Sequence, residues 1–397
     1  MTDEKESSVL VQVVKDGYKN FFNNQWSVMT AGILIAVISI ALFAWARPWG
    51  VVGGLRNWAD WLFYLVGAYN KKPINPLIST NSILTLGLLW GAFISALMAK
   101  QFAFNRIPKL EMIKAVVGGL FLGVGSAMAG GCNLGGFYMA LSSLSLTGLL
   151  MFAGLLAGAN LGIRYLFWEM ENIPTGGTGG GGSKEGGFNW KSIQPYLGVA
   201  MFILALVSVY IYNSMALTVV GGLLMGTLAI GFIFQRSRIC FVAGFRDPFM
   251  TGETDKTKAI IVSIIITILG FAALKWTGLR PEGAYVTSTF WFGSLVGGLI
   301  FGFGMVISGG CGSGCVFRAG EGNIKLIIVL VFFATSNSLF KQLINSSAGF
   351  KSLIGSRFFM PDVLSYSWTI VIAIAAMLAW YLFVTWNEET EKFVIEL

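Results

Sequence analysis

Long apolar segments recur along the whole of this 397-residue chain, and they constrain its fold more than any other feature. A helix needs about 20 predominantly apolar residues to cross a bilayer. Only 12% of the residues are charged, which is fewer than a soluble protein of this length would carry. The sequence therefore predicts an all-α polytopic membrane protein. The predicted spans are residues 26–45, 82–99, 115–130, 137–168, 195–213, 216–234, 259–276, 290–308, 325–344 and 368–386.

Basic residues in the loops predict the orientation of the chain. The first apolar segment lacks a cleavage pattern, so we expect it to remain as a span and not to be a signal peptide. Cytoplasmic loops are enriched in Lys and Arg, which favours a cytoplasmic N-terminus and a cytoplasmic location for two loop clusters. The basic residues are spread over the loops, which argues against a nucleic-acid surface. The residues concerned are Lys5, Lys15 and Lys19 near the N-terminus, Lys100, Arg106, Lys109 and Lys114 in one loop, and Arg236, Arg238 and Arg246 in another.

An internal repeat relates the two parts of the chain. Residues 118–132 read GGLFLGVGSAMAGGC and residues 297–311 read GGLIFGFGMVISGGC, with eight of fifteen positions identical at an offset of 179. A weaker similarity precedes each block, and on it we match residues 99–108 to residues 235–248. Transporters are often built from such repeats, with the substrate site where interrupted helices meet near the midplane. We predict an N-terminal membrane half at 1–170, a Gly/Ser-rich linker at 171–192 and a C-terminal membrane half at 193–397.

Glycines next to two cysteines are expected to interrupt their spans. Gly130 and Gly131 precede Cys132 and Asn133, and Gly309 and Gly310 precede Cys311. Such glycine-rich stretches are poor helix interiors, and the backbone groups that a break frees can bind a small guest. We expect the two breaks to face each other across a small polar passage. The alternative is helix packing alone, which we favour for Gly119, Gly123, Gly298 and Gly302 because of their small-xxx-small spacing.

Cysteine is the only side chain here with strong nucleophilic or soft-ligand character, because the chain has no histidine. A thiol is a weak hydrogen-bond donor with a polarizable sulfur, so a row of thiols suits a soft, sulfur-bearing anion. Weak binding at several sites is what passage requires. Arg238, two residues before Cys240, either attracts anions to the cytoplasmic mouth or serves only as a topology charge.

Two other functions fit parts of the same pattern. Cys311 and Cys315 form a CxxxC spacing that a membrane thiol–disulfide oxidoreductase would use, although it is looser than the usual CxxC pair. A soft-metal channel would combine thiolates with the methionines near them. We favour a transporter without a cofactor or a resident metal over both, and we expect no enzyme activity.

The motifs together resemble the YeeE/YedE family of bacterial inner-membrane sulfur-transport proteins, and the chain looks nearest to the longer YedE branch. The matching elements are the two Gly-Gly-Cys blocks, the Arg-Ser-Arg-Ile-Cys-Phe segment at 236–241 and the Gly-Phe-Arg-Asp-Pro segment at 244–248. The resemblance implies an hourglass-like helical protein in the bacterial inner membrane. Its two faces would dip toward a thin central barrier.

The resemblance also implies a function and its residues. It implies uptake of thiosulfate, handed inward through successive contacts with the thiols of Cys132, Cys311 and Cys240. The YedE branch is associated with selenium metabolism, so a selenium anion is the alternative cargo. The family further implies a small cytoplasmic sulfur-carrier protein as a partner. Cys315 matches no family motif.

Overall fold

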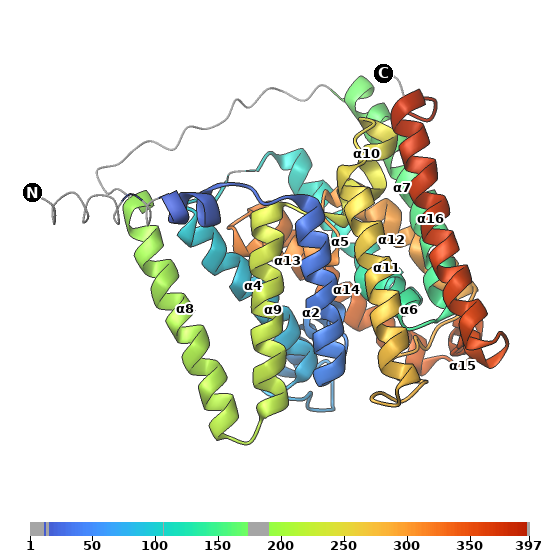
Figure 1. The fold of residues 1–397 in the computed structure, drawn as a ribbon, viewed down its shortest axis with the longest axis horizontal. Coiled ribbons are helices and arrows are strands. Elements are labelled where there is room, and N and C mark those ends of the chain that lie inside the picture. Colours follow the sequence, from blue (N-terminus) through green and yellow to red (C-terminus); the bar gives the residue numbers. More distant parts are fainter. Residues whose placement is uncertain (1–11, 13–15, 106, 174–189, 395–397) are drawn as a thin grey trace, which may run out of the picture.

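The computed structural model describes residues 12, 16–105, 107–173 and 190–394. Lys5, Lys15, Arg106 and the glycine-rich stretch 175–187 lie outside the described residues, so the linker at 171–192 stays a prediction. Within the described part, the regular elements are helices. One isolated antiparallel β-bridge pairs Ser145 with Phe359. Figure 1 shows the long helices standing side by side.

Ten helical segments of the described chain are long and apolar enough to cross a membrane, and each matches a predicted span. Seven are single helices. These are α2 (Val28–Trp45), α4 (Thr80–Met98), α7 (Leu146–Asn172), α8 (Trp190–Ser214), α11 (Asp255–Trp276), α14 (Ile324–Ser346) and α16 (Tyr366–Thr390).

The other three segments are interrupted. One comprises α5 (Lys109–Ala129), the π-helix η2 (Asn133–Tyr138) and α6 (Met139–Ser142); the others are α9 (Thr218–Ser237) with α10 (Phe241–Met250), and α12 (Phe292–Ser308) with α13 (Gly312–Gly320). The predicted span 137–168 was therefore wrong in its limits, because a turn at residues 143–145 separates α6 from α7. The shorter elements are η1 (Lys19–Asn23), α3 (Val52–Leu65), α15 (Ala348–Ile354) and η3 (Met360–Asp362).

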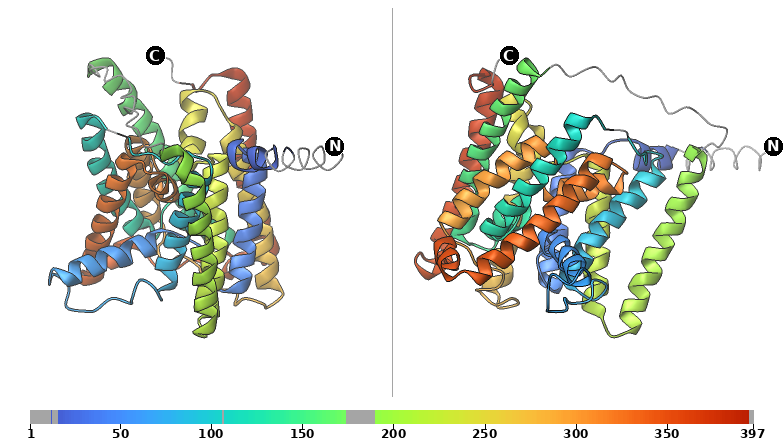
Figure 2. Two further views of the ribbon diagram at one scale, coloured as in Figure 1. Left: turned by 90° about the vertical axis from the view of Figure 1, so that its left-hand side faces the viewer. Right: turned by 180° about the vertical axis from the view of Figure 1, so that it is seen from behind.

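Equivalent helix contacts reveal how the repeat is arranged. Helix α5 packs against α14 as α12 packs against α7, and α2 packs against α11 as α9 packs against α4. Likewise α3 packs against α4 and α14, and α10 packs against α11 and α7. These contacts are equivalent if α2 corresponds to α9, α3 to α10 and so on, up to α7 and α14. Figure 2 shows helices from early and late parts of the sequence lying next to each other.

This arrangement corrects one detail of the predicted repeat. The counterpart of the α9–α10 break is the break between α2 and α3 at residues 46–51, and residues 99–108 are a connection after α4. The sequences following the two breaks support this pairing, because Gly-Leu-Arg-Asn at 54–57 resembles Gly-Phe-Arg-Asp at 244–247.

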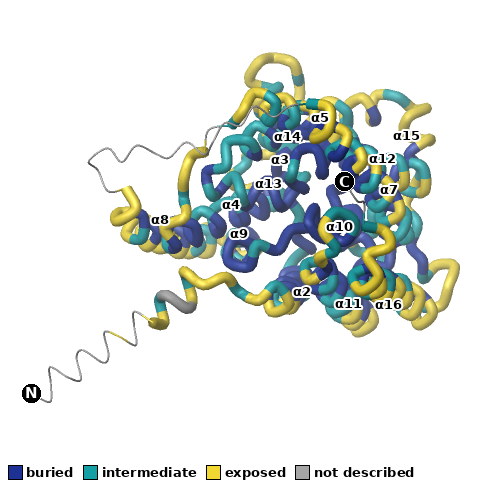
Figure 3. The backbone as a smooth tube through the Cα atoms, turned by 90° about the horizontal axis from the view of Figure 1, so that it is seen from above, coloured by how far each residue is buried: buried dark blue, intermediate teal, exposed yellow. Residues whose placement is uncertain are grey.

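The glycines with small-xxx-small spacing pack helices closely, as expected. A Cβ on Gly119 would lie 2.7 Å from the Val329 carbonyl oxygen of α14, and one on Gly298 would lie 2.7 Å from the Met151 carbonyl oxygen of α7. These close contacts draw the broken segments into the centre of the molecule. In Figure 3 buried backbone gathers around α13 and the end of α9, and more exposed backbone lies at the rim.

The two basic loops that the sequence assigns to the cytoplasm meet on one face, together with the residues that lead into α2. The backbone N–H of Trp26 donates to the Arg236 carbonyl oxygen (3.1 Å), and the Arg236 side chain bonds Gln101 in the α4–α5 connection. We call this the terminal face, and the other side, where α3 lies, the opposite face. The direction of each face across the membrane stays a prediction.

Candidate substrate path

Left-handed glycines end α5 and α12. Gly130 caps α5 with φ +75° and Gly309 caps α12 with φ +73°, a backbone region that favours glycine. The glycine after each of them also has no room for a side chain. A Cβ would lie 2.7 Å from the Gly136 nitrogen at Gly131, and 2.5 Å from the Cys315 Sγ at Gly310. The predicted breaks are therefore present.

Each of the three predicted path cysteines is the N-cap residue of the segment that follows its break. Cys132 precedes η2, Cys311 precedes α13 and Cys240 precedes α10. The Cys311 Sγ accepts a hydrogen bond from the Gly314 backbone N–H (3.3 Å). The side chains of Cys132 and Cys240 make no such capping hydrogen bond. The first N–H groups of a helix lack partners within it, so each thiol lies where the backbone can also receive an anion.

The same three thiols come together around the start of α13. A Cβ on Gly312 would lie 3.0 Å from the Cys132 Sγ. A Cβ on Gly314 would lie 3.1 Å from the Cys311 Sγ and 3.8 Å from the Cys240 Sγ. The side chains of Cys240 and Cys311 also interact directly. Two glycines of α13 therefore separate Cys132 from the other two cysteines.

Asn133 is a buried amide without partners. Its side chain is completely buried, and neither its nitrogen nor its oxygen has a hydrogen-bond partner among the described residues. Burying an unpaired polar group costs about 1–3 kcal/mol, which natural proteins rarely tolerate without a reason. Asn133 directly follows Cys132, so a guest passing that thiol is one such reason.

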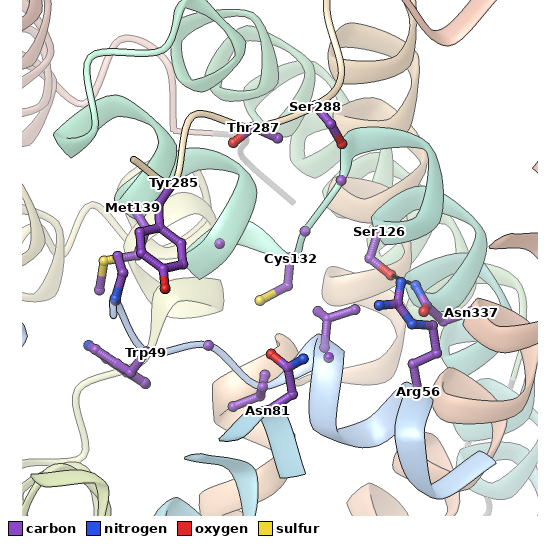
Figure 4. A pocket seen from close by; sticks show the side chains of 18 of the residues that line it. Trp49, Arg56, Asn81, Ser126, Cys132, Met139, Tyr285, Thr287, Ser288 and Asn337 are labelled. Carbon is purple, nitrogen blue, oxygen red and sulfur yellow. Dashed lines mark hydrogen bonds between the residues drawn. The ribbon is translucent and has the colours of Figure 1, made fainter. Parts of the chain in front are cut away.

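A cavity of about 440 Å³ reaches Cys132 from the opposite face. In Figure 4 the Cys132 thiol faces this cavity, with Tyr285 and Met139 on one side and Arg56 and Asn337 on the other. The α2–α3 break supplies much of the wall, and the glycines before Cys132 supply another part. The cavity therefore ends at the central cluster of thiols.

Three cations and no carboxylate are found among the described residues that line this cavity. The cations are Arg47, Arg56 and Lys341. Arg47 donates to the Thr80 hydroxyl (3.0 Å), and partial burial lowers the pKa of its guanidinium. Arg56 and Lys341 also line an adjoining cavity of about 740 Å³, together with Lys71, Lys72 and the acidic residue Asp60. A concave surface with one sign of charge concentrates ions of the other sign, so the cavity that reaches Cys132 attracts anions.

Comparison with known proteins identifies the family. The sulphur transport family matches residues 4–161 and 236–395, which is most of the chain. The two matched blocks contain all four cysteines, and the glycine-rich stretch lies between them. This chain belongs to the sulphur transport family. Its double match agrees with the internal repeat and with the paired helix contacts.

Named relatives carry transport functions. A protein described as probable transporter YedE from Escherichia coli K12 is 26% identical over 320 residues, covering 75% of this chain and 77% of that protein. The thiosulfate transporter TsuA from Escherichia coli K12 is 36% identical over 125 residues, 31% of this chain and 34% of that protein. TsuA from Spirochaeta thermophila is 32% identical over 136 residues, 33% and 40% of the two chains. The sulphur transport family member described here is thus a multi-pass, sulfur-related membrane transporter and not an enzyme.

Sequence reasoning missed the cationic cavity of this family member. Arg56 and Lys341 are 285 positions apart, so no local pattern in the sequence brings them together. The similarity between residues 54–57 and 244–247 was the available signal. In that similarity Arg56 follows the α2–α3 break in the same way that Arg246 follows the α9–α10 break, which contains Cys240.

Arg238 and Arg246 of the terminal face form ion pairs, unlike the arginines of the cavity. Arg238 forms an ion pair with Glu321 (2.6 Å) and also donates to Gln101 (3.1 Å). Arg246 pairs with Asp247 (2.8 Å). Arg238 is two residues from Cys240 in the chain, but the Glu321 carboxylate neutralises its charge in this conformation.

Proposed function

We propose that this transporter takes up thiosulfate, or a closely related small sulfur or selenium anion, along a path past Cys132, Cys311 and Cys240. The observation that carries this proposal is the meeting of three N-cap thiols around the first residues of α13. Similarity to the TsuA proteins supports thiosulfate as the cargo. The path is proposed to be a relay of contacts, because the cysteines are free thiols and not a disulfide.

The chemistry of thiols at helix ends suits a thiosulfate ion. The S–H groups and the backbone N–H groups both donate hydrogen bonds, and the polarizable cysteine sulfur suits the terminal sulfur of the ion. Each thiol is a weak donor without a full charge, so the ion is held less tightly than by an arginine. Asn133 would add two amide donors for the sulfonate oxygens beside Cys132. An ion can therefore pass from one site to the next without a deep energy minimum.

Capture of the anion is assigned to the opposite face. Arg47, Arg56 and Lys341 line this cavity and are only partly exposed, so their attraction for an anion is stronger than on an open surface. From this cavity the ion reaches Cys132 directly. The two glycines of α13 would then have to yield for it to reach Cys311 and Cys240.

The proposed direction is inward across the bacterial inner membrane. The basic loops on the terminal face favour the cytoplasm for that face and for the N-terminus. The cationic cavity then opens on the outside, and Cys240 lies at the inner end. A small cytoplasmic sulfur-carrier protein is the proposed acceptor of the cargo on that side.

Competition defines the cargo in purified protein. Proteoliposomes containing the transporter should accumulate radiolabelled thiosulfate, and unlabelled thiosulfate should compete more strongly than sulfate. Selenite and selenate, added as further competitors, test the alternative cargo. Stronger competition by a selenium anion than by thiosulfate would reassign the substrate, and no accumulation above protein-free vesicles would refute the proposal.

A further inference from the structure

Gln101 makes an unusual set of contacts on the terminal face. Its side-chain oxygen accepts hydrogen bonds from the Gln235 amide (2.8 Å), the Arg236 guanidinium (2.9 Å) and the Arg238 guanidinium (3.1 Å). Three donors, two of them cationic, thus converge on one neutral oxygen. An ionised oxygen would bind two cationic donors more strongly than this neutral one.

The arginines beside Gln101 have more donors than acceptors. Arg236 is 2% exposed, and its Nη1 atom is buried without any hydrogen-bond partner. Its Nε donates to the Gln235 side-chain oxygen (2.7 Å), which also accepts from Ser95 (2.7 Å). A buried guanidinium with a free donor is a costly arrangement unless an acceptor arrives at some stage.

The oxygen of Gln101 is held in place by its own backbone. Lys100, two residues after the end of α4, has a left-handed conformation (φ +58°), and the Gln101 N–H donates back to the Ala96 carbonyl oxygen (2.8 Å). The same connection bonds the end of α13, because the Ala103 N–H donates to the Glu321 carbonyl oxygen (3.2 Å). Glu321 in turn binds Arg238. The ends of α4, α9 and α13 are therefore joined around one point.

That point lies next to the inner end of the proposed path. Arg238 caps the end of α9, Ile239 follows and Cys240 caps the start of α10, so the Arg236–Arg238 pair lies within four residues of the Cys240 thiol along the chain. We propose that this pair is an oxyanion-binding site, and that Gln101 occupies it in the closed state as a tethered substitute for an oxygen of the anion. This inference rests on the proposed function and extends it.

Competition between the Gln101 oxygen and the anion explains how the anion would leave. Two arginines in a partly buried position would bind an oxyanion too tightly for rapid passage. The return of the Gln101 oxygen, together with the Glu321 carboxylate on Arg238, displaces the anion toward the cytoplasm. The opposite face has no such neutralising groups among the residues lining its cavity, so capture is favoured there and release is favoured here.

Equilibrium anion binding tests the inference without relying on transport. Thermal unfolding of the purified full-length protein would be measured against sulfate and thiosulfate, with chloride at matched ionic strength. Gln101→Leu removes the competing oxygen, so we expect sulfate to bind roughly tenfold more tightly than in the unaltered protein, the worth of one charge-assisted hydrogen bond. Gln101→Glu neutralises the pair permanently and should weaken anion binding and slow thiosulfate uptake.

A matched control and a second substitution make the test specific. Gln25 lies on the same face and donates to the Ser237 carbonyl oxygen (3.2 Å), with no hydrogen bond to either arginine in the described part of the chain, so Gln25→Leu should bind anions as the unaltered protein does. All variants share the cavity of the opposite face, so differences among them report on the terminal face. The gain from Gln101→Leu should disappear when Arg238→Gln is added.

Several outcomes would overturn the inference. The first is equal sulfate affinity in the unaltered protein, Gln101→Leu and Gln101→Glu. The second is a gain in sulfate affinity from Gln101→Leu that persists when Arg238→Gln is added. The third is a thermal shift with chloride equal to that with sulfate. If Gln101→Leu does not fold, Gln101→Glu decides alone, because unchanged anion binding in that variant contradicts the proposal. Failure of the unaltered protein to take up thiosulfate would refute the proposed function and leave this binding comparison standing.

Discussion

Gly312 and Cys132 are in contact at the centre of the molecule, with only 3.0 Å between the Cys132 Sγ and the position of a Cβ on Gly312. This contact is where the cavity of the opposite face ends and where the first turn of α13 begins. In the proposed path an anion must cross it to reach Cys311.

Adding one methyl group at this contact should obstruct the path. In Gly312→Ala the new Cβ would also lie 3.2 Å from a Val51 methyl group, so the free space beside the thiol is lost. We expect thiosulfate uptake to fall by roughly tenfold or more, an effect of about 1.4 kcal/mol on the barrier. Gly349→Ala, where the nearest atom is 4.0 Å away, is the control and should behave normally. Full uptake by Gly312→Ala would place the path elsewhere.

Removing a cavity cation should weaken capture more than passage. We expect Arg56→Gln to raise the KM for thiosulfate roughly five- to tenfold with little change in kcat, because a charge-assisted contact is lost before the barrier. The difference should shrink as salt is raised, since partly exposed charges are screened. Arg164, an exposed arginine of α7 that does not line the cavity, supplies the control Arg164→Gln. An unchanged KM in Arg56→Gln would refute the capture role.

Asn133 should show opposite effects on stability and transport. Asn133→Ala removes a buried amide that has no partner in the described structure, so the protein should unfold at the same temperature or a higher one. Uptake should nevertheless fall, because the amide donors for the anion are gone. Thermal unfolding and uptake measured on one preparation separate the two effects. Lower stability with normal uptake per folded protein would assign Asn133 a purely structural role.

Much of this arrangement could be predicted from sequence because local chemistry controls it. Gly130 and Gly309 end their helices through a backbone conformation that favours glycine, and this is visible without any neighbour. Cys132 and Cys311 were predictable for the same reason, since each follows such a glycine. Cys240 has no glycine before it and was named only through the resemblance to the family. The role of Arg56 was not, because it depends on α14 supplying Lys341 to the same cavity. The pairing of Arg238 with Glu321 and Gln101 joins three distant segments, and no local pattern predicts it.

The orientation of the chain is separately testable. Helix α16 ends on the terminal face, where Asn387 bonds the Pro248 carbonyl oxygen at the end of α10 (2.8 Å). A green fluorescent protein fused to the C-terminus should therefore fluoresce, since it folds in the cytoplasm, and an alkaline phosphatase fusion there should be inactive. The reverse pattern would place the cationic cavity inside the cell and contradict uptake by this route.

Uptake of radiolabelled thiosulfate by cysteine variants in proteoliposomes tests the central claim most directly. Cys132→Ala, Cys311→Ala and Cys240→Ala should each lose most of the uptake while inserting and unfolding like the unaltered protein. Cys315→Ala, a buried cysteine one turn further along α13, is the matched control and should retain uptake. Full uptake by the double variant Cys132→Ala with Cys311→Ala would contradict a cysteine-lined path.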